Sequence, residues 1–100
     1  VPLGFTPGYA AYNGLRNELW VSQAVTGNKV VVFERMNNAW MKMSEIQTGL
    51  DAHAIAFTKD GLTAYVTNQG AATVSVIDVK NRTKSQDIAV GKKPNGIVLK

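Results

Sequence analysis

The sequence contains no cysteine. Within these residues, this absence excludes a disulfide framework, a metal site built on thiolates and the covalent attachment of a c-type haem. It does not fix a cellular compartment, although it is compatible with an oxidising one. The chain also lacks any apolar run that approaches the ~20 residues of a membrane span. We therefore expect no membrane-spanning segment.

Helical periodicity and catalytic motifs are missing as well. No segment of about ten or more residues places apolar side chains at helical spacing. No nucleophile motif, phosphate-binding loop or metal-ligand cluster appears. The carboxylates are scattered, and Glu34 and Asp78 occupy equivalent strand ends, where we expect them to accept turn N–H bonds. We therefore predict no catalytic residue, no metal site and no bound cofactor.

The charge of the chain is moderate but uneven. The formal net charge is +4. Residues 1–63 carry five basic and five acidic groups, whereas residues 64–100 carry six basic and two acidic groups. Such a basic region can attract a small anionic ligand. Most of its basic residues are also explained as solvent-exposed side chains of an outer strand and its loops. Basic residues do not alternate with stacking aromatic residues, so we expect no nucleic-acid partner.

A duplicated pattern of strand-like segments runs through the chain. Residues 19–23 and 30–34 are rich in apolar and β-branched side chains, and the pattern returns at 64–68 and 74–78. Trp20 and Tyr65 lie 45 positions apart, and we expect them at equivalent second-strand positions between blades. A period of about 40–45 residues with several short strands per unit is typical of a β-propeller blade.

The second unit carries a family signature. It reads Tyr65-Val66-Thr67-Asn68, followed by strand-like residues 73–78 and by Gly91-Lys92-Lys93-Pro94-Asn95-Gly96. This closely resembles the YVTN family of β-propeller repeats, which is common in prokaryotic periplasmic and cell-surface proteins. The first unit has Trp20-Val21-Ser22-Gln23 in place of the signature. The resemblance implies a periplasmic or extracellular, cell-surface location.

We predict an all-β fold, a β-propeller segment with about two four-stranded blades and one strand of a preceding blade. Residues 1–13 form the end of a preceding blade (the innermost strand of the next unit), 14–58 the first blade repeat and 59–100 the second, YVTN-type repeat. The expected innermost strands are 9–13, 54–58 and 96–100, the second strands 18–22 and 64–68, the third strands 29–34 and 73–79, and the outer strands 40–45 and 84–90.

A blade needs a neighbour on each side to cover its faces. Because the chain begins at Val1 without a methionine, we expect a segment of a longer polypeptide rather than copies that close one ring.

His53 is the candidate cofactor-binding residue, and the alternative for this lone histidine is a structural role that bonds the loop. It lies in the connection that enters the innermost strand, at the face where propeller loops converge on the central channel. Neutral imidazole is a good ligand for iron and can act as an acid or base near neutral pH. The propeller domains of haem-d nitrite reductases look similar here, because they place histidines just before the innermost strand. The expected channel-mouth loop residues are Asp51, His53, Lys92, Lys93 and Asn95.

The leading functional prediction is a non-enzymatic binding or assembly scaffold. Its expected partners are the remaining propeller blades, either from the same longer chain or from copies of this chain, and a protein or small anionic ligand at the channel mouth. The alternative is part of a propeller oxidoreductase that carries a haem-type cofactor over the channel. A third possibility is a lactonase-like hydrolase, for which the sequence shows no constellation of catalytic residues.

Overall fold

The computed structural model describes residues 7–23 and 27–90, which form eight β-strands and no helix. The strands are β1 (Pro7–Asn13), β2 (Glu18–Gln23), β3 (Lys29–Met36), β4 (Ala39–Gln47), β5 (Ala52–Phe57), β6 (Thr63–Asn68), β7 (Thr73–Asp78) and β8 (Thr83–Ala89). No membrane-spanning helix therefore occurs in this part of the chain. The all-β prediction is confirmed.

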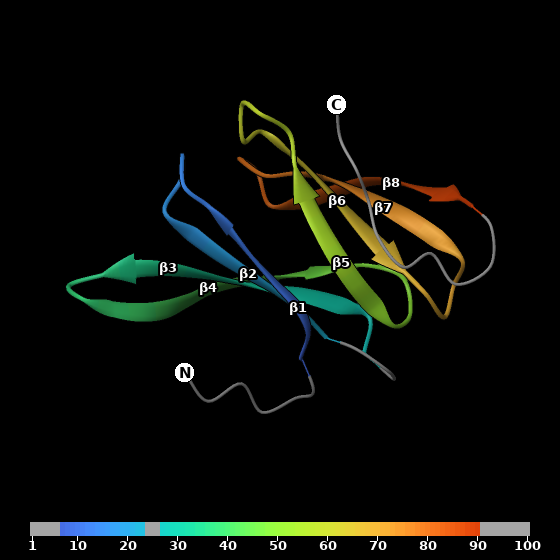
Figure 1. The fold of residues 1–100 in the computed structure, drawn as a ribbon, viewed down its shortest axis with the longest axis horizontal. Coiled ribbons are helices and arrows are strands. Elements are labelled where there is room, and N and C mark those ends of the chain that lie inside the picture. Colours follow the sequence, from blue (N-terminus) through green and yellow to red (C-terminus); the bar gives the residue numbers. More distant parts are fainter. Residues whose placement is uncertain (1–6, 24–26, 91–100) are drawn as a thin grey trace.

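The strands form two antiparallel four-stranded sheets, each in sequence order, β1-β2-β3-β4 and β5-β6-β7-β8 (Figure 1). Each expected strand that falls in the described residues is present. The strand expected at 96–100 lies outside them. Because β1 pairs with β2, residues 7–13 supply the innermost strand of the first sheet. The sequence repeats are thus offset by one strand from the sheets: residues 14–58 contain β2, β3 and β4 of one sheet and β5 of the next.

Tight turns connect the strands where the sequence supplies residues that tolerate a positive φ. Asn37 and Asn38 adopt φ values of 52° and 64° between β3 and β4, and Gly61 adopts 71° between β5 and β6. Asparagine and glycine are the residues that adopt this left-handed conformation most readily. The Asp60 carboxylate accepts the Leu62 N–H at 3.0 Å and closes the turn before β6. Lys59-Asp60-Gly61 thus forms the corner between β5 and β6.

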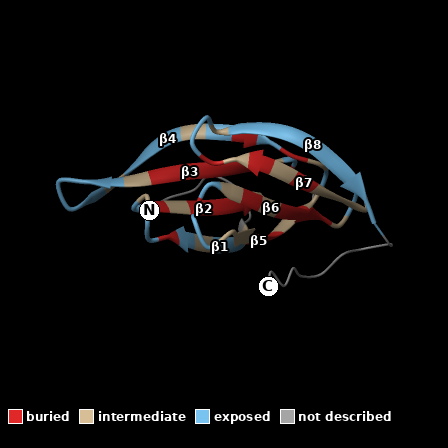
Figure 2. Cartoon of the chain, turned by 90° about the horizontal axis from the view of Figure 1, so that it is seen from above, coloured by how far each residue is buried: buried red, intermediate tan, exposed pale blue. Residues whose placement is uncertain are grey.

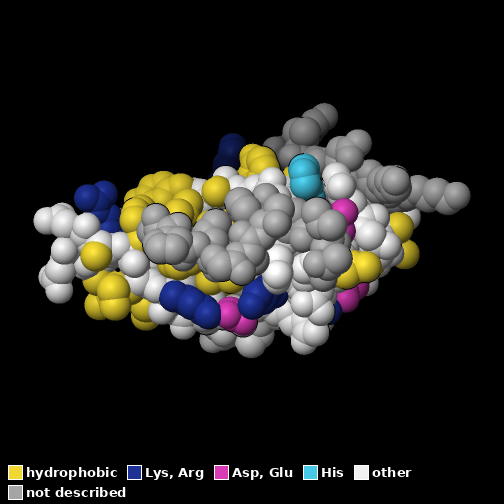
Figure 3. All heavy atoms as spheres, turned by 90° about the horizontal axis from the view of Figure 1, so that it is seen from below, with side chains coloured by type: hydrophobic (Ala, Val, Ile, Leu, Met, Phe, Trp, Pro, Cys, Tyr) yellow, Lys and Arg dark blue, Asp and Glu magenta, His cyan; other side chains and the backbone are white. Residues whose placement is uncertain are grey.

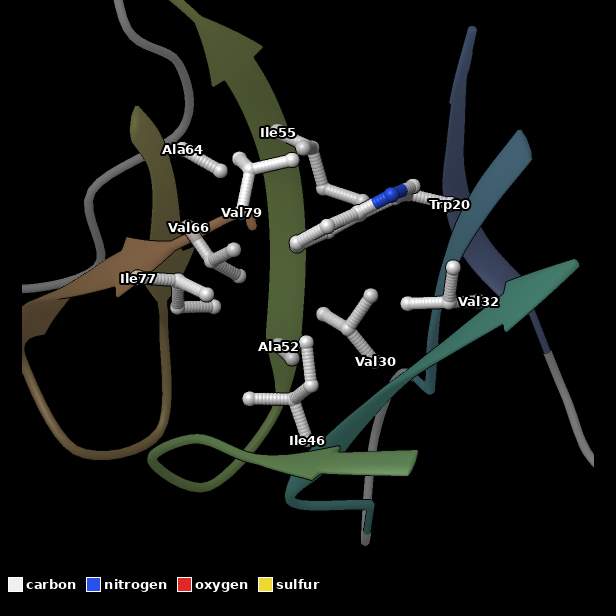
Figure 4. Close-up of a cluster of buried hydrophobic side chains, with 10 residues drawn as sticks. All are labelled: Trp20, Val30, Val32, Ile46, Ala52, Ile55, Ala64, Val66, Ile77 and Val79. Carbon is white, nitrogen blue, oxygen red and sulfur yellow. The ribbon is translucent and has the colours of Figure 1, made fainter. Parts of the chain in front are cut away.

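The two sheets pack face to face, with β1 beside β5 and β4 beside β8 (Figure 2). Burial is concentrated in the middle strands, whereas β8 is exposed along its whole length, as expected for an outermost strand. The shared core lies between the sheets (Figure 4) and consists of Trp20, Val30, Val32, Ile46, Ala52, Ile55, Ala64, Val66, Ile77 and Val79. The Trp20 ring reaches across from β2 and meets Phe57 of β5 edge-on, with ring centroids 5.2 Å apart.

The two middle strands of the first sheet, β2 and β3, are buried on both faces. Val30 and Val32 belong to the core between the sheets, whereas Val31 and Phe33 belong to a second cluster with Val21. Successive side chains of a strand point to opposite faces, so the second cluster lies on the side of the first sheet that faces away from the second. The continuous apolar run in β3 is explained by this two-sided burial.

A cluster of ionised side chains, here called the Glu18 cluster, joins the sheets at one corner. The Glu18 side chain is only 2% exposed. Its Oε2 lies 2.7 Å from Nη2 of Arg82, which comes from the β7–β8 turn of the other sheet, and 3.5 Å from Nε of Arg16. Its Oε1 accepts the Trp20 indole N–H at 3.1 Å. Arg82 Nη2 also lies 3.5 Å from Glu34 Oε2, so one guanidinium connects two carboxylates of the first sheet to the second.

Candidate functional site

His53 lies within β5 as its second residue, so its predicted place in the loop before that strand is wrong. The strand begins early because Ala52 already pairs with Asn68 of β6, ahead of an irregularity between Ala52 and Ile55. The preceding residue, Asp51, makes the turn: its φ is 57°, and its carbonyl accepts the Gln69 N–H at 2.9 Å.

The backbone of His53 is fixed, whereas its ring lies partly at the surface (Figure 3). Its carbonyl accepts the hydroxyl of the fully buried Ser22 at 2.7 Å, which ties β5 to the first sheet. The ring centroid lies 6.5 Å from that of Tyr9 on β1, with the planes tilted by 43°. An imidazole and a tyrosine from the two innermost strands are therefore neighbours at the junction of the sheets.

If the protein held a haem-type cofactor, the His53 ring would bind its iron. The groups around this ring therefore indicate whether such a cofactor fits. Metal-bound imidazoles almost always donate their second N–H to a carboxylate, a backbone carbonyl or water, which orients the ring. Among the described residues, the Nδ1 of His53 is buried without a hydrogen-bond partner, and no group of three metal-ligating side chains occurs. Within the described part of the chain, no side chain or backbone group supplies an orienting partner for the His53 ring.

Of the other expected channel-mouth residues, only Asp51 lies in the described part of the chain. Its N–H donates to the Gly27 carbonyl at 2.6 Å, so the β4–β5 turn is bonded to the β2–β3 connection as well as to β6. Asp51 and His53 are thus brought to the same end of β5. Lys92, Lys93 and Asn95 lie outside the described residues.

The expectation for the strand-end carboxylates holds for Asp78 and not for Glu34. Asp78 Oδ1 accepts the Asn81 N–H at 3.2 Å, and Oδ2 accepts the Asn81 side-chain amide at 3.0 Å. These two bonds hold the pKa of Asp78 below the usual value of an aspartic acid, so it is ionised at neutral pH. Glu34 instead pairs across the interface with Arg82.

A second surface is the side of the second sheet that points away from the first, here called the outer face. The register pairs Trp20 with Val32 in the first sheet and Tyr65 with Val76 in the second. This confirms that Trp20 and Tyr65 occupy equivalent positions. The register likewise makes Val74 and Ile88 of the outer face equivalent to Val30 and Ile46.

The equivalent residues differ strongly in burial. Trp20, Val30 and Val32 are 0% exposed because the second sheet covers them. By contrast, Ile88 is 43% exposed, and Tyr65, Val74 and Val76 are partly exposed. The outer face therefore repeats an apolar docking surface, and no strand of the described residues covers it. The alternation of apolar residues in β7 is the sequence signal for this surface.

A groove lies at one corner of the outer face. Its volume is about 400 Å³, and it is lined by Leu62, Thr63, Val76, Ile77, Asp78, Lys80 and Ser85. Glu18 pairs with Glu34 in the first sheet, and Thr63 pairs with Asp78 in the second. The groove in the second sheet therefore lies at the position that corresponds to the Glu18 cluster in the first sheet. In the first sheet, Arg82 fills this position.

Solved structures with this arrangement define the fold as that of a partial β-propeller. Over 90% of its length, the chain is similar to hydrazine synthase from Kuenenia stuttgartiensis, with a TM-score of 0.81 and 26% sequence identity, and covers 25% of that chain. It is also similar over 90% of its length to a putative 6-phosphogluconolactonase from Bacteroides fragilis, with a TM-score of 0.78 and 18% identity, and covers 27% of that chain. No family model and no curated protein matches the sequence. The chain thus spans about a quarter of the length of each of these two structures.

Proposed function

We propose that this chain supplies two consecutive blades of a β-propeller and acts as a non-enzymatic binding and assembly scaffold. The observation that carries the proposal is the equivalence between the uncovered outer face and the buried face of the first sheet. An apolar sheet face of this kind is normally covered in a repeat protein by the next unit. The scaffold function is therefore to hold neighbouring blades in a ring.

The sequence supports a cellular location for this scaffold, and its innermost strands offer a surface for a ligand. The resemblance of the second repeat to YVTN repeats supports a periplasmic or cell-surface location in a prokaryote. Tyr9 is 45% exposed beside His53, so two rings at the junction of the innermost strands are available to a protein or a small ligand. Rigid strands that present such side chains provide a fixed surface for binding.

The first experiment measures self-association of the 100-residue chain by sedimentation velocity at rising concentration. We expect oligomers, because a copy offers a blade that can cover the outer face head-to-tail. Val76→Asp places a charge in the centre of this face and should return the chain to monomer. The matched control is Asn28→Asp, which adds the same charge at an exposed loop position. A cooperatively folded monomer at every concentration contradicts the proposal.

A haem titration separates the scaffold from the oxidoreductase alternative. We expect the absorption spectrum of added haem to change in the same way with the wild-type chain and with His53→Ala, because His53 lacks an orienting partner. Thermal melting of both proteins checks that the variant folds. A Soret shift that requires His53 would replace the scaffold proposal with the cofactor-carrying alternative.

A further inference from the structure

The side of the first sheet that faces away from the second, here called the back face, carries the cluster of Val21, Val31 and Phe33. These side chains are between 2% and 5% exposed, and Trp40 packs against them. Trp40 comes from the outermost strand β4, and its ring meets Tyr12 of the innermost strand β1 edge-on. The ring centroids lie 6.3 Å apart, with the planes at 85°. Two rings from opposite edges of the sheet therefore meet over its middle strands.

The contact between Tyr12 and Trp40 resembles the aromatic contact that joins the two sheets. Tyr12 pairs with the residue that precedes Trp20. Phe57 pairs with the residue that precedes Tyr65, which is the equivalent of Trp20. Tyr12 and Phe57 are therefore equivalent. Phe57 receives Trp20 from the neighbouring sheet edge-on, with the planes at 90°. Trp40 thus meets Tyr12 in the same way as the tryptophan of a neighbouring sheet meets Phe57.

The second sheet uses the residue equivalent to Trp40 differently. Lys42 in β4 and Lys84 in β8 pair at the register shift of each outermost strand, and Trp40 and Arg82 each lie two positions before this lysine. Arg82 lies in the β7–β8 turn with a φ of 55° and reaches Glu18 of the first sheet. Trp40 lies inside β4 and covers its own sheet. The first sheet therefore carries an aromatic cover where the second sheet carries a cation that binds its neighbour.

We propose that Trp40 is a cap on the back face, which occupies the aromatic position at Tyr12 and must leave it before another blade can dock there. The blade that fits this position is that of a second copy of this chain, because the outer face of a copy presents Tyr65, the equivalent of Trp20. The inference rests on the proposed scaffold function, because it identifies the contact that limits self-association of the scaffold.

Removal of the cap should strengthen self-association. For Trp40→Ala, we expect association about fivefold tighter by sedimentation equilibrium, a factor within the range that one edge-to-face aromatic pair contributes. In a Tyr65→Ala background, Trp40→Ala should give no gain, because a copy then has no ring to place against Tyr12. Met41→Ala is the matched control, because Met41 is 50% exposed on the same strand and its side chain points to the opposite face.

A second measurement follows Trp40 in the chain without any substitution. The chain has two tryptophans, so labelling with 5-fluorotryptophan gives two fluorine NMR resonances, which Trp40→Phe assigns. As the protein concentration rises, we expect the Trp40 resonance to move toward that of a solvent-exposed indole. The Trp20 resonance should stay in place, because Trp20 is fully buried in the core of each copy.

The outcomes separate the cap from the scaffold proposal. The cap is overturned if Trp40→Ala melts normally and associates no more tightly than the wild type, or if its gain survives Tyr65→Ala. If Trp40→Ala does not melt cooperatively, an unchanged Trp40 resonance in the wild-type oligomer overturns the cap. If the cap fails while Val76→Asp still dissociates the oligomer, the scaffold stands. If neither the wild type nor Trp40→Ala associates, both fail.

Discussion

Replacing Trp20 with alanine is expected to lower the free energy of unfolding by about 3–5 kcal/mol, the range for truncating a large buried aromatic residue. Trp20 is fully buried, its ring meets Phe57, and its indole N–H binds Glu18. The change therefore removes packing between the sheets and one partner of a buried carboxylate. Urea denaturation followed by far-UV circular dichroism measures the loss.

Two further variants interpret the Trp20 result. Trp20→Phe keeps an aromatic ring against Phe57 but removes the N–H donor to Glu18, so its loss should be intermediate. Tyr65→Ala should cost less than Trp20→Ala in this chain, because Tyr65 is only partly buried. Equal and small losses for Trp20→Ala and Tyr65→Ala would mean that the two sheets do not pack through the Trp20 face.

Replacing Arg82 with alanine is expected to cost about 3 kcal/mol, because it leaves a buried carboxylate without its closest cation. Glu18 keeps Arg16, whose Nε lies 3.5 Å away, so the cost falls at the low end of the 3–5 kcal/mol range for breaking buried ion pairs. The free energy of unfolding from urea denaturation measures it.

The control for Arg82 is Lys84→Ala. Lys84 pairs with Asp87 at 2.7 Å, but both side chains are about one-third exposed, so this change should cost no more than about 1 kcal/mol. A double-mutant cycle of Arg82→Ala with Glu18→Gln then isolates the coupling between the two residues. If Arg82→Ala costs no more than Lys84→Ala, the Glu18 cluster does not hold the sheets together.

The local pattern of the chain was sufficient to predict its strands. The apolar run of β3, the turn residues Asn37 and Asn38 and the polar outer strand β8 each act through short-range effects: side-chain alternation, backbone φ and solvation. Their repetition at about 40–45 residues predicted the propeller class because a repeat reproduces the same local requirements.

The candidate sites were harder to predict. His53 is the chain's one imidazole and was singled out for that reason, but its membership of β5 depends on the pairing of Ala52 with Asn68. The groove at Asp78 was missed because its walls come from two turns and three strands. Spacing along the sequence does not show which of these segments face the same side of a sheet.

The sequence by itself determined the all-β class, the positions of the strands and the repeat that makes Trp20 and Tyr65 equivalent. Only the tertiary structure decided that Trp20 is fully buried and Tyr65 only partly, and that Arg82 reaches Glu18 across 64 positions of sequence. The physical reason is that strand formation depends on neighbouring residues, whereas burial and ion pairing depend on which sheet packs against which. Which residues become buried or paired is therefore determined only when the two sheets pack against each other.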